Sequence, residues 1–160
     1  MQEPRRAPES VWDYPRPPRL EREPRPISII FGGVVVCRTV AAWRVLETSH
    51  PPTYYLPKWD FADGCLRDAV GASHCEWKGW ARYLDVVAGD RVVAAAAWEY
   101  PMPTHPYEEL AEHVGVFCAS MDVCWVGDEM AEPQPGRFYG GWVTSWVSGP
   151  FKGGPDTCDW

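Results

Sequence analysis

The stretch CEWKGWARYLDVVAGDRVVAAAAWEY, residues 75–100, decides the fold class of this chain. It begins with an alternating aromatic run and ends with a β-branched run, and Ala88-Gly89-Asp90 lies between the two. Side chains of a strand alternate between two faces, and a glycine beside an acidic residue is typical of a tight turn. The stretch therefore predicts two strands joined at Ala88-Gly89-Asp90.

Short strands are predicted on both sides of this stretch. ISIIFGGVVVC (27–37) predicts a hairpin that turns at its Gly-Gly pair, while TYYLP (53–57) and GVFCASMDVCWV (115–126) have strand character. TVAAWRVLETSH (39–50) fits either a helical stripe or a strand. Only PYEELAEHV (106–114) predicts a helix, with acids in its first turn. The expected fold is mainly β, a compact antiparallel β domain with one short helix.

The first 26 residues differ in composition from the rest of the chain. They hold seven prolines, and six arginines against five acids, whereas residues 27–160 carry a net charge of −8. Proline removes a backbone donor and disfavours helix in the residue before it. We therefore expect a flexible tail over residues 1–26, ordered only where it docks, and a single β domain over residues 27–160. An acidic body repels phosphate backbones, so no nucleic-acid partner is expected.

No signal peptide or membrane span is evident, because the chain lacks a run of about 18 apolar residues and the tail lacks an apolar core. We expect a cytoplasmic protein with no membrane partner. Its six cysteines are then expected to be reduced thiols, and without a CxxC pair or a close histidine pair neither a metal nor another cofactor is expected. Redox chemistry by Cys118 and Cys124 stays open, and it requires the two sulfurs to lie close together.

The residues at the start of the deciding stretch have two interpretations. If the strand begins at Cys75, then Cys75 and Trp77 share one face while Glu76 and Lys78 share the other, which disfavours a reaction that needs both Cys75 and Lys78. On a solvated face, Glu76 and Lys78 form a surface ion pair of about 0–1 kcal/mol. In a pocket, Lys78 becomes an anion clamp held by Glu76.

Five blocks in the same order carry a family resemblance: FGGVVV, VLETSHPPTYYLP, CEWKGWARYLDV, AAWEYPMP and FYGGWVTSWVSGPFKGGPDTCDW. Over about residues 27–160 the chain resembles domain-of-unknown-function family 427, in a subset with the long FYGGW and GPFKG coda. The resemblance implies a fold of the β-tent type and an extended strand over residues 39–50. The family has a nucleotidyltransferase-like label, kept as a minor alternative because no alternating carboxylates follow Gly32-Gly33.

The same blocks nominate a site for a small polar or anionic molecule. Ten tryptophans and seven tyrosines exceed what packing alone needs, and aromatics in excess suggest a pocket or a contact surface. Tyr54 and Tyr55 alternate, so one of them is expected to face inward. The expected catalytic residues are Glu47 and His50 as acid and base, Tyr55 and Lys78; the expected ligand-binding residues are Tyr54, Trp77, Trp98, Tyr100 and Lys152.

The glycine-rich coda has three interpretations. Backbone amides around Lys152 would receive an anion. Alternatively, the glycines let a long arm wrap the body, anchored by Phe138, Trp142, Trp146 and Trp160, which is the favoured interpretation. The arm would equally clasp a second subunit and form a homodimer.

Two functions of different class remain open. The first is a cofactor-independent enzyme that acts on a small polar or anionic ligand. The second is a non-catalytic binding or assembly module that uses aromatic surfaces and the proline-rich tail. Convergence of Glu47, Tyr55 and Lys78 in one cavity would favour the first, and divergence onto a flat face would favour the second.

Overall fold

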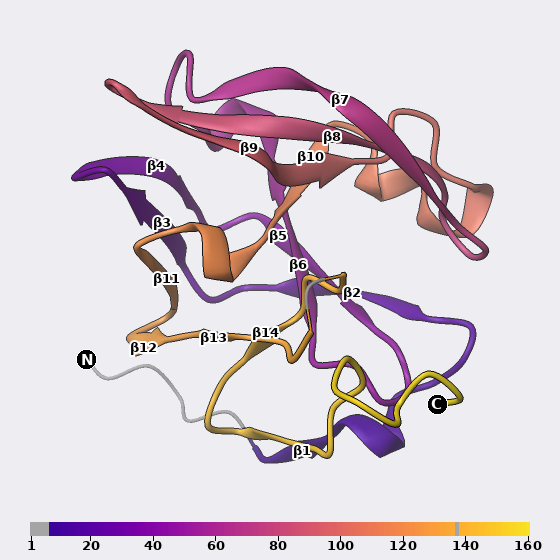
Figure 1. Ribbon diagram of the computed structural model, residues 1–160. Coiled ribbons are helices and arrows are strands. Elements are labelled where there is room, and N and C mark those ends of the chain that lie inside the picture. The colour runs from indigo at the N-terminus through magenta and orange to yellow at the C-terminus, as the bar shows by residue number, and fades with distance from the viewer. Residues whose placement is uncertain (1–6, 137) are drawn as a thin grey trace.

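The computed structural model describes residues 7–136 and 138–160 and consists mainly of β-strands (Figure 1). Its largest sheet has seven antiparallel strands. Their spatial order is β2 (Arg19–Glu23), β5 (Ala42–Leu46), β6 (Thr53–Pro57), β10 (His113–Val116), β9 (Arg91–Glu99), β8 (Gly79–Ala88) and β7 (Leu66–Cys75). The prediction of a mainly β, antiparallel domain is confirmed.

A second antiparallel sheet and several short elements complete the fold. The second sheet contains, in spatial order, β12 (Glu129–Met130), β11 (Val123–Val126), β3 (Ile27–Phe31) and β4 (Val34–Thr39). Two short pairs are β1 (Glu9–Ser10) with β15 (Val147–Ser148) and β13 (Glu132–Pro133) with β14 (Trp142–Val143). The 3₁₀ helices are η1 (Val11–Asp13), η2 (Lys58–Asp60), η3 (His105–Leu110) and η4 (Cys118–Ser120). None of the helices in the described part of the chain is long and apolar enough to cross a membrane.

One contiguous hydrophobic core contains side chains from both large sheets. Ile27, Ile29 and Phe31 alternate along β3 and are all buried, as a strand with one inward face requires. Leu84 and Val86 are buried in the same way on β8. This shared core fixes the position of the two sheets and of the loops that leave them.

Both predicted hairpins are present. β3 and β4 are joined through Gly32 and Gly33, whose φ angles are 59° and 76°. Positive φ at both central residues is typical of a type I′ turn, which glycine adopts without strain. β8 and β9 are joined at Gly89, as expected. Residues 39–50, which fitted either a helix or a strand, include strand β5.

The predicted helix over residues 106–114 is present only in its first part. The 3₁₀ helix η3 ends at Leu110, and His113–Val116 is strand β10. Glu112 lies between them with a φ of 62°, which ends the helical path. β10 pairs with β6 on one side and β9 on the other, and these two ladders stabilise the extended conformation more than a short helix would gain.

The largest correction concerns the start of the deciding stretch. A strand was predicted to begin at Cys75. Instead, Cys75 is the last residue of β7, and a turn over residues 76–78 leads into β8. Gly79 opens β8 with a φ of 106°, a conformation that favours glycine. Strand β7 itself is missing from the prediction because LRDAVGASHC has no continuous apolar run and lies at the edge of the sheet.

Residues 7–26 are docked on the body, which is the condition under which order was expected in the tail. β2 pairs with β5, and Val11 is fully buried. The buried Arg44 guanidinium donates to both carboxylate oxygens of Glu9, at 2.9 Å each, and to Glu21 at 2.7 Å. Sheet pairing and this ion-pair cluster therefore offset the cost of ordering a proline-rich segment. Residues 1–6 of the predicted tail lie outside the described residues.

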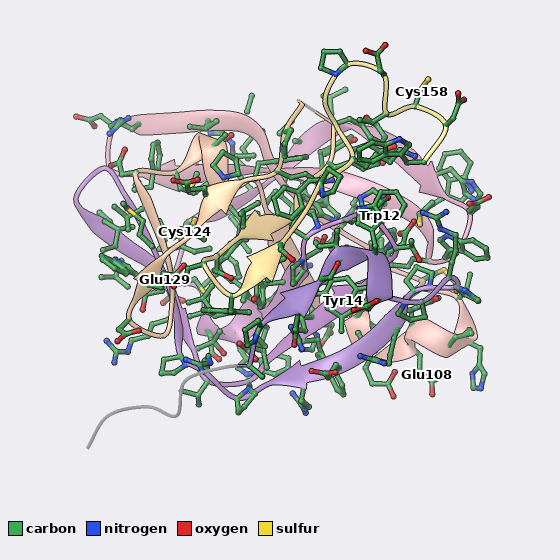
Figure 2. The ribbon with its side chains drawn as sticks, turned by 90° about the horizontal axis from the view of Figure 1, so that it is seen from below. Trp12, Tyr14, Glu108, Cys124, Glu129 and Cys158 are labelled. Atoms are coloured by element: carbon green, nitrogen blue, oxygen red, sulfur yellow. The ribbon has the colours of Figure 1, made fainter. Side chains whose placement is uncertain are left out.

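The C-terminal segment folds back onto the N-terminal one. β15 pairs with β1, and the Trp12 indole donates to the Pro150 carbonyl at 2.9 Å. Trp12, labelled in Figure 2, also contacts Trp160, with ring centroids 5.1 Å apart. Among the expected anchors, Trp142 is fully buried, whereas Phe138 is 66% exposed. The arm thus packs on its own chain, and a homodimer formed through it stays a prediction.

Candidate functional site

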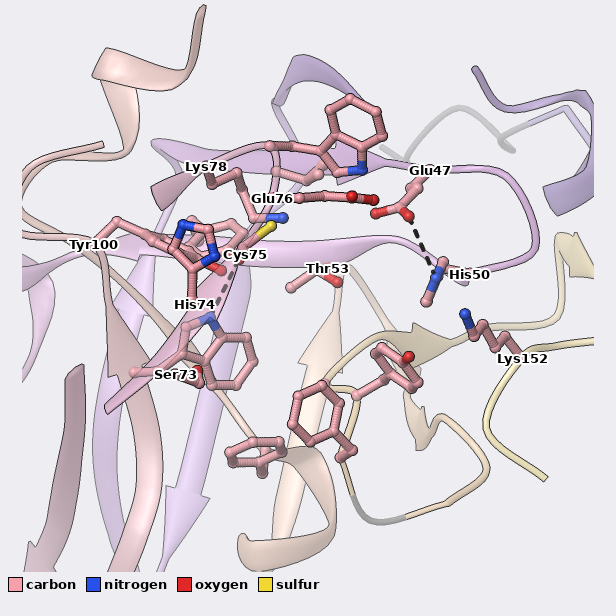
Figure 3. A pocket seen from close by; sticks show the side chains of 18 of the residues that line it. Glu47, His50, Thr53, Ser73, His74, Cys75, Glu76, Lys78, Tyr100 and Lys152 are labelled. Carbon is pink, nitrogen blue, oxygen red and sulfur yellow. Dashed lines mark hydrogen bonds and ion pairs between the residues drawn. The ribbon is translucent and has the colours of Figure 1, made fainter. Parts of the chain in front are cut away.

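A cavity of about 290 Å³ lies where four distant segments meet (Figure 3). These are the β5–β6 loop, the β7–β8 turn, the end of β9 and the C-terminal segment around residues 138–152. All predicted site residues except Tyr54 line it: Glu47, His50, Tyr55, Trp77, Lys78, Trp98, Tyr100 and Lys152.

Tyr54 and Tyr55 take opposite sides of β6, as the period of a strand requires. Tyr55 faces the cavity and is 2% exposed. Tyr54 faces the main core, where its ring lies 5.2 Å from that of Trp142. Tyr54 is therefore a core residue, and its assignment to the ligand-binding set is corrected.

The β7–β8 turn brings Cys75 and Lys78 together. The prediction placed them on opposite faces of one strand, but the chain reverses between them, and the Lys78 ammonium lies beside the Cys75 sulfur in Figure 3. The Lys78 ammonium also lies 5.6 Å from the centroid of the Tyr100 ring. The strand period disfavoured a reaction that needs both Cys75 and Lys78, but the turn places both side chains in the cavity.

Lys78 is a buried cation. Its side chain is only 7% exposed, and among residues 7–136 and 138–160 no carboxylate lies within 4.0 Å of its nitrogen. Burial by itself lowers the pKa of Lys78, but Tyr55, Cys75 and Glu47 together outweigh burial and raise it. Lys78 is thus an ammonium at neutral pH, and the cavity holds a positive charge without a close counterion.

His50 is oriented by Gln134, a residue that the sequence analysis missed. The Gly141 amide donates to Gln134 Oε1 at 3.0 Å, so the Gln134 amide nitrogen faces His50 Nδ1, at 3.1 Å, as a donor. His50 Nδ1 is then an acceptor, and its proton lies on Nε2, which is 3.6 Å from the Glu47 carboxylate. Gln134 lies in a proline-rich loop with no periodic pattern, and nothing in the sequence marks it as a partner of His50.

Burial changes the proton affinity of both members of the Glu47–His50 pair. Burial, followed by the charges of Lys152, Arg16 and Lys78, lowers the pKa of His50 to about 4. Burial raises the pKa of Glu47, against the opposing effect of the same cations. The imidazole is therefore neutral at neutral pH, and Glu47 is the group whose pKa moves toward the range useful for acid–base chemistry.

An aromatic wall closes one side of the cavity. The Trp98 indole donates to the Tyr55 hydroxyl at 3.2 Å, and the Tyr100 ring lies next to that of Tyr55, with centroids 6.2 Å apart. Trp98 fits because Gly115 and Gly140 lie against its ring, where any β-carbon would overlap the indole. The ring therefore has one allowed position, and Tyr55 is held with it.

Replacing Gly140 by Ala tests this arrangement. The added methyl group must displace the Trp98 ring, and overpacking of this kind costs about 1–3 kcal/mol. We expect the free energy of unfolding, measured in urea, to fall by that amount. Gly154→Ala is the matched control, because nothing lies within 4 Å of its added β-carbon. Equal losses of stability in the two variants would show that overlap with the Trp98 ring is not what makes Gly140→Ala unstable.

Lys152 lies across the cavity from Lys78, but the glycines around it do not form an open anion cradle. The Lys152 ammonium donates to the main-chain oxygen of Trp160 at 3.0 Å and lies 5.5 Å from the Tyr139 ring. The backbone amides of Lys152 and Gly153 donate to Ser49 and Thr157. An anion would therefore meet the ammonium of Lys152 rather than these backbone amides.

Two other predicted features lie outside this cavity. The Gly32 amide donates to Asp122 at 2.8 Å, so the Gly-Gly turn of the nucleotidyltransferase-like alternative is a hairpin turn remote from the lining residues. Cys118 and Cys124 are buried free thiols, and the Cys118 thiol donates to the Ala131 carbonyl at 3.5 Å, so redox chemistry by the two cysteines stays a prediction. Within the described ranges, His, Cys, Asp and Glu side chains form no cluster of three that would hold a metal ion.

Comparison with known proteins places the chain in one family. A family model described as a domain of unknown function (DUF427) matches residues 19–127. The match begins at strand β2, inside the segment predicted as a tail, and includes the cavity residues from Glu47 to Phe117. It ends before the coda, so membership of the long-coda subset stays a prediction. A search of curated proteins finds no match.

Proposed function

Since this chain belongs to the DUF427 family, whose description leaves the function open, we propose its function from the cavity: the protein binds a small anionic molecule at Lys78 and acts on it by acid–base chemistry at Glu47. The observation that carries the proposal is a desolvated ammonium, in a cavity of about 290 Å³, with no carboxylate of the described chain within ion-pair distance.

The state of Lys78 favours an anionic ligand. An uncompensated buried charge is costly, and a bound carboxylate or phosphate would supply the missing counterion. Lys152 adds a second positive charge, and the rings of Trp77 and Trp98 offer apolar surface beside the charges. Ligand sites commonly combine such an apolar lining with a few polar groups that fix orientation.

Glu47 is the group best suited to move a proton. Its burial raises its pKa, and His50 faces it with Nε2–H. A ligand whose anionic end binds Lys78 presents its remaining polar groups toward Glu47, because Figure 3 shows the Glu47 carboxylate and the Lys78 ammonium directed into the same space. Glu47 then serves as the general acid or base, and His50 holds its orientation.

A thermal-shift screen with a Lys78→Met variant tests the binding step. Carboxylates, phosphate monoesters and nucleotides are compared with their uncharged amide or alcohol analogues, in the wild type and in the variant. We expect at least one anion to raise the melting temperature of the wild type and to lose this effect in Lys78→Met. At 100 times its Kd, a bound anion adds about 2.7 kcal/mol to the free energy of unfolding. Arg38→Met, an exposed cation on β4 that does not line the cavity, is the control.

The results also separate the proposed function from the assembly module. A screen without anionic hits, or a hit that survives in Lys78→Met, would contradict the proposal and favour an assembly module. With a hit in hand, Glu47→Gln is expected to keep binding and to abolish conversion of the ligand, followed by mass spectrometry. Full conversion by Glu47→Gln would remove the catalytic role from this residue.

A further inference from the structure

We propose that Cys75 is a nucleophile in this cavity, paired with the Lys78 ammonium, and that it forms a covalent bond with small anionic electrophiles. The inference rests on the proposed function in one respect, the binding of an anion at Lys78. It adds a reacting atom that neither the sequence nor the family description assigns.

The geometry supplies both an attacking sulfur and a charge beside it. Cys75 is half-buried and lines the cavity, whereas Cys37, Cys65 and Cys124 are buried in the main core. Its sulfur lies beside the Lys78 ammonium in Figure 3, and that ammonium lies 5.6 Å from the centroid of the Tyr100 ring. A nearby ammonium stabilises a thiolate, the nucleophilic form of cysteine.

The same ammonium selects the electrophile. Lys78 attracts a carboxylate or phosphate and places the adjoining carbon of the ligand close to the sulfur, whereas Glu76 and Glu47 on the cavity wall oppose a second negative charge. The cavity therefore suits a molecule with one anionic group next to an electrophilic carbon. Aromatic side chains on the wall, Trp77 and Tyr100 among them, limit its size.

Iodoacetate is a probe with these properties, and iodoacetamide is its uncharged analogue. In the reaction the thiol proton passes to the buffer, the thiolate attacks the CH₂ carbon, a C–S bond forms, the C–I bond breaks and iodide leaves. Site-resolved mass spectrometry gives the rate at Cys75 for each reagent. The ratio of the two rates is compared with that of N-acetylcysteine amide, an uncharged thiol in solution.

We expect the iodoacetate-to-iodoacetamide ratio at Cys75 to exceed that of the free thiol by about tenfold, and to fall to the free-thiol value in Lys78→Met. Cys158 is an internal reference for which we expect the opposite preference between the two reagents. It is exposed, and its sulfur lies 3.9 Å from the Asp159 carboxylate, which repels iodoacetate. A wild-type ratio at Cys75 no higher than that of the free thiol overturns the inference, and this measurement needs no variant. A preference that persists in folded Lys78→Met also overturns it.

The outcome is distinguishable from failure of the proposed function. An anion that stabilises the wild type without any preference for iodoacetate at Cys75 supports the binding proposal and contradicts the nucleophile. A preference for iodoacetate that depends on Lys78, in a protein that no anion of the screen stabilises, supports the nucleophile and contradicts the binding and acid–base proposal.

Discussion

Replacing Arg44 by Met is expected to lower the free energy of unfolding by about 3 kcal/mol. The guanidinium is 2% exposed and forms a bidentate pair with Glu9 and a further ion pair with Glu21. Removing one partner of a buried pair typically costs about 3–5 kcal/mol, because the other charges lose their counterion. Here the lower end applies, since the Glu9 and Glu21 side chains are 24% and 37% exposed and retain some hydration.

Urea unfolding followed by tryptophan fluorescence measures this loss, and limited proteolysis locates it. Because Arg44 joins β5 to the N-terminal segment, cleavage within residues 9–23 is expected to become faster in the variant. Arg38→Met, on an exposed position of β4, controls for the loss of a positive charge. A loss below about 1 kcal/mol, the range of exposed ion pairs, would mean that the cluster is effectively solvated.

Local patterns predicted the elements that depend on local chemistry. The Gly32-Gly33 and Gly89 turns follow from glycine at positions of positive φ, and the opposite directions of Tyr54 and Tyr55 follow from the strand period. These features depend on only a few neighbouring residues, so they can be predicted from the local sequence.

Features that depend on distant partners were not predictable. β7 is a mostly polar strand that exists because β8 pairs with it, and this pairing turns residues 76–78 into a loop and places Cys75 beside Lys78. The orientation of His50 depends on Gln134, which is 84 residues further along the chain. Docking of the N-terminal segment depends on Arg44 in β5, and composition alone described that segment as a flexible tail.

His50 is expected to make stability depend on pH. Its pKa is about 4 in the folded protein and about 6.5 in an unfolded chain, so the unfolded state takes up the proton first as the pH falls. The contribution of His50 is thus fully present above about pH 6.5 and is lost progressively as the pH falls to about 4. The difference between the folded and unfolded pKa values of His50 corresponds to a loss of about 3 kcal/mol in the free energy of unfolding.

Glu47 acts in the opposite direction within the same region. Its folded-state pKa is raised, so its favourable contribution exists at low pH, where the carboxyl is protonated, and is lost as the pH rises through that value. A comparison of the wild type with His50→Gln therefore isolates the histidine better than the wild-type curve alone. Lys152, Arg16 and Lys78, which lower the pKa of His50, are present in both proteins.

We expect His50→Gln to lose more stability relative to the wild type at about pH 7.5 than at about pH 4.5, by roughly 2–3 kcal/mol, in urea unfolding at the two pH values. Nitrogen-15 NMR of the wild-type ring is expected to show a neutral imidazole with its proton on Nε2 down to about pH 5, because Gln134 donates to Nδ1. Parallel stability curves, or a ring that becomes protonated near pH 6.5, would mean that His50 is solvated in the folded protein. The neutral imidazole that faces the Glu47 carboxylate with its Nε2–H group would then be lost, and with it the acid–base role assigned to the pair.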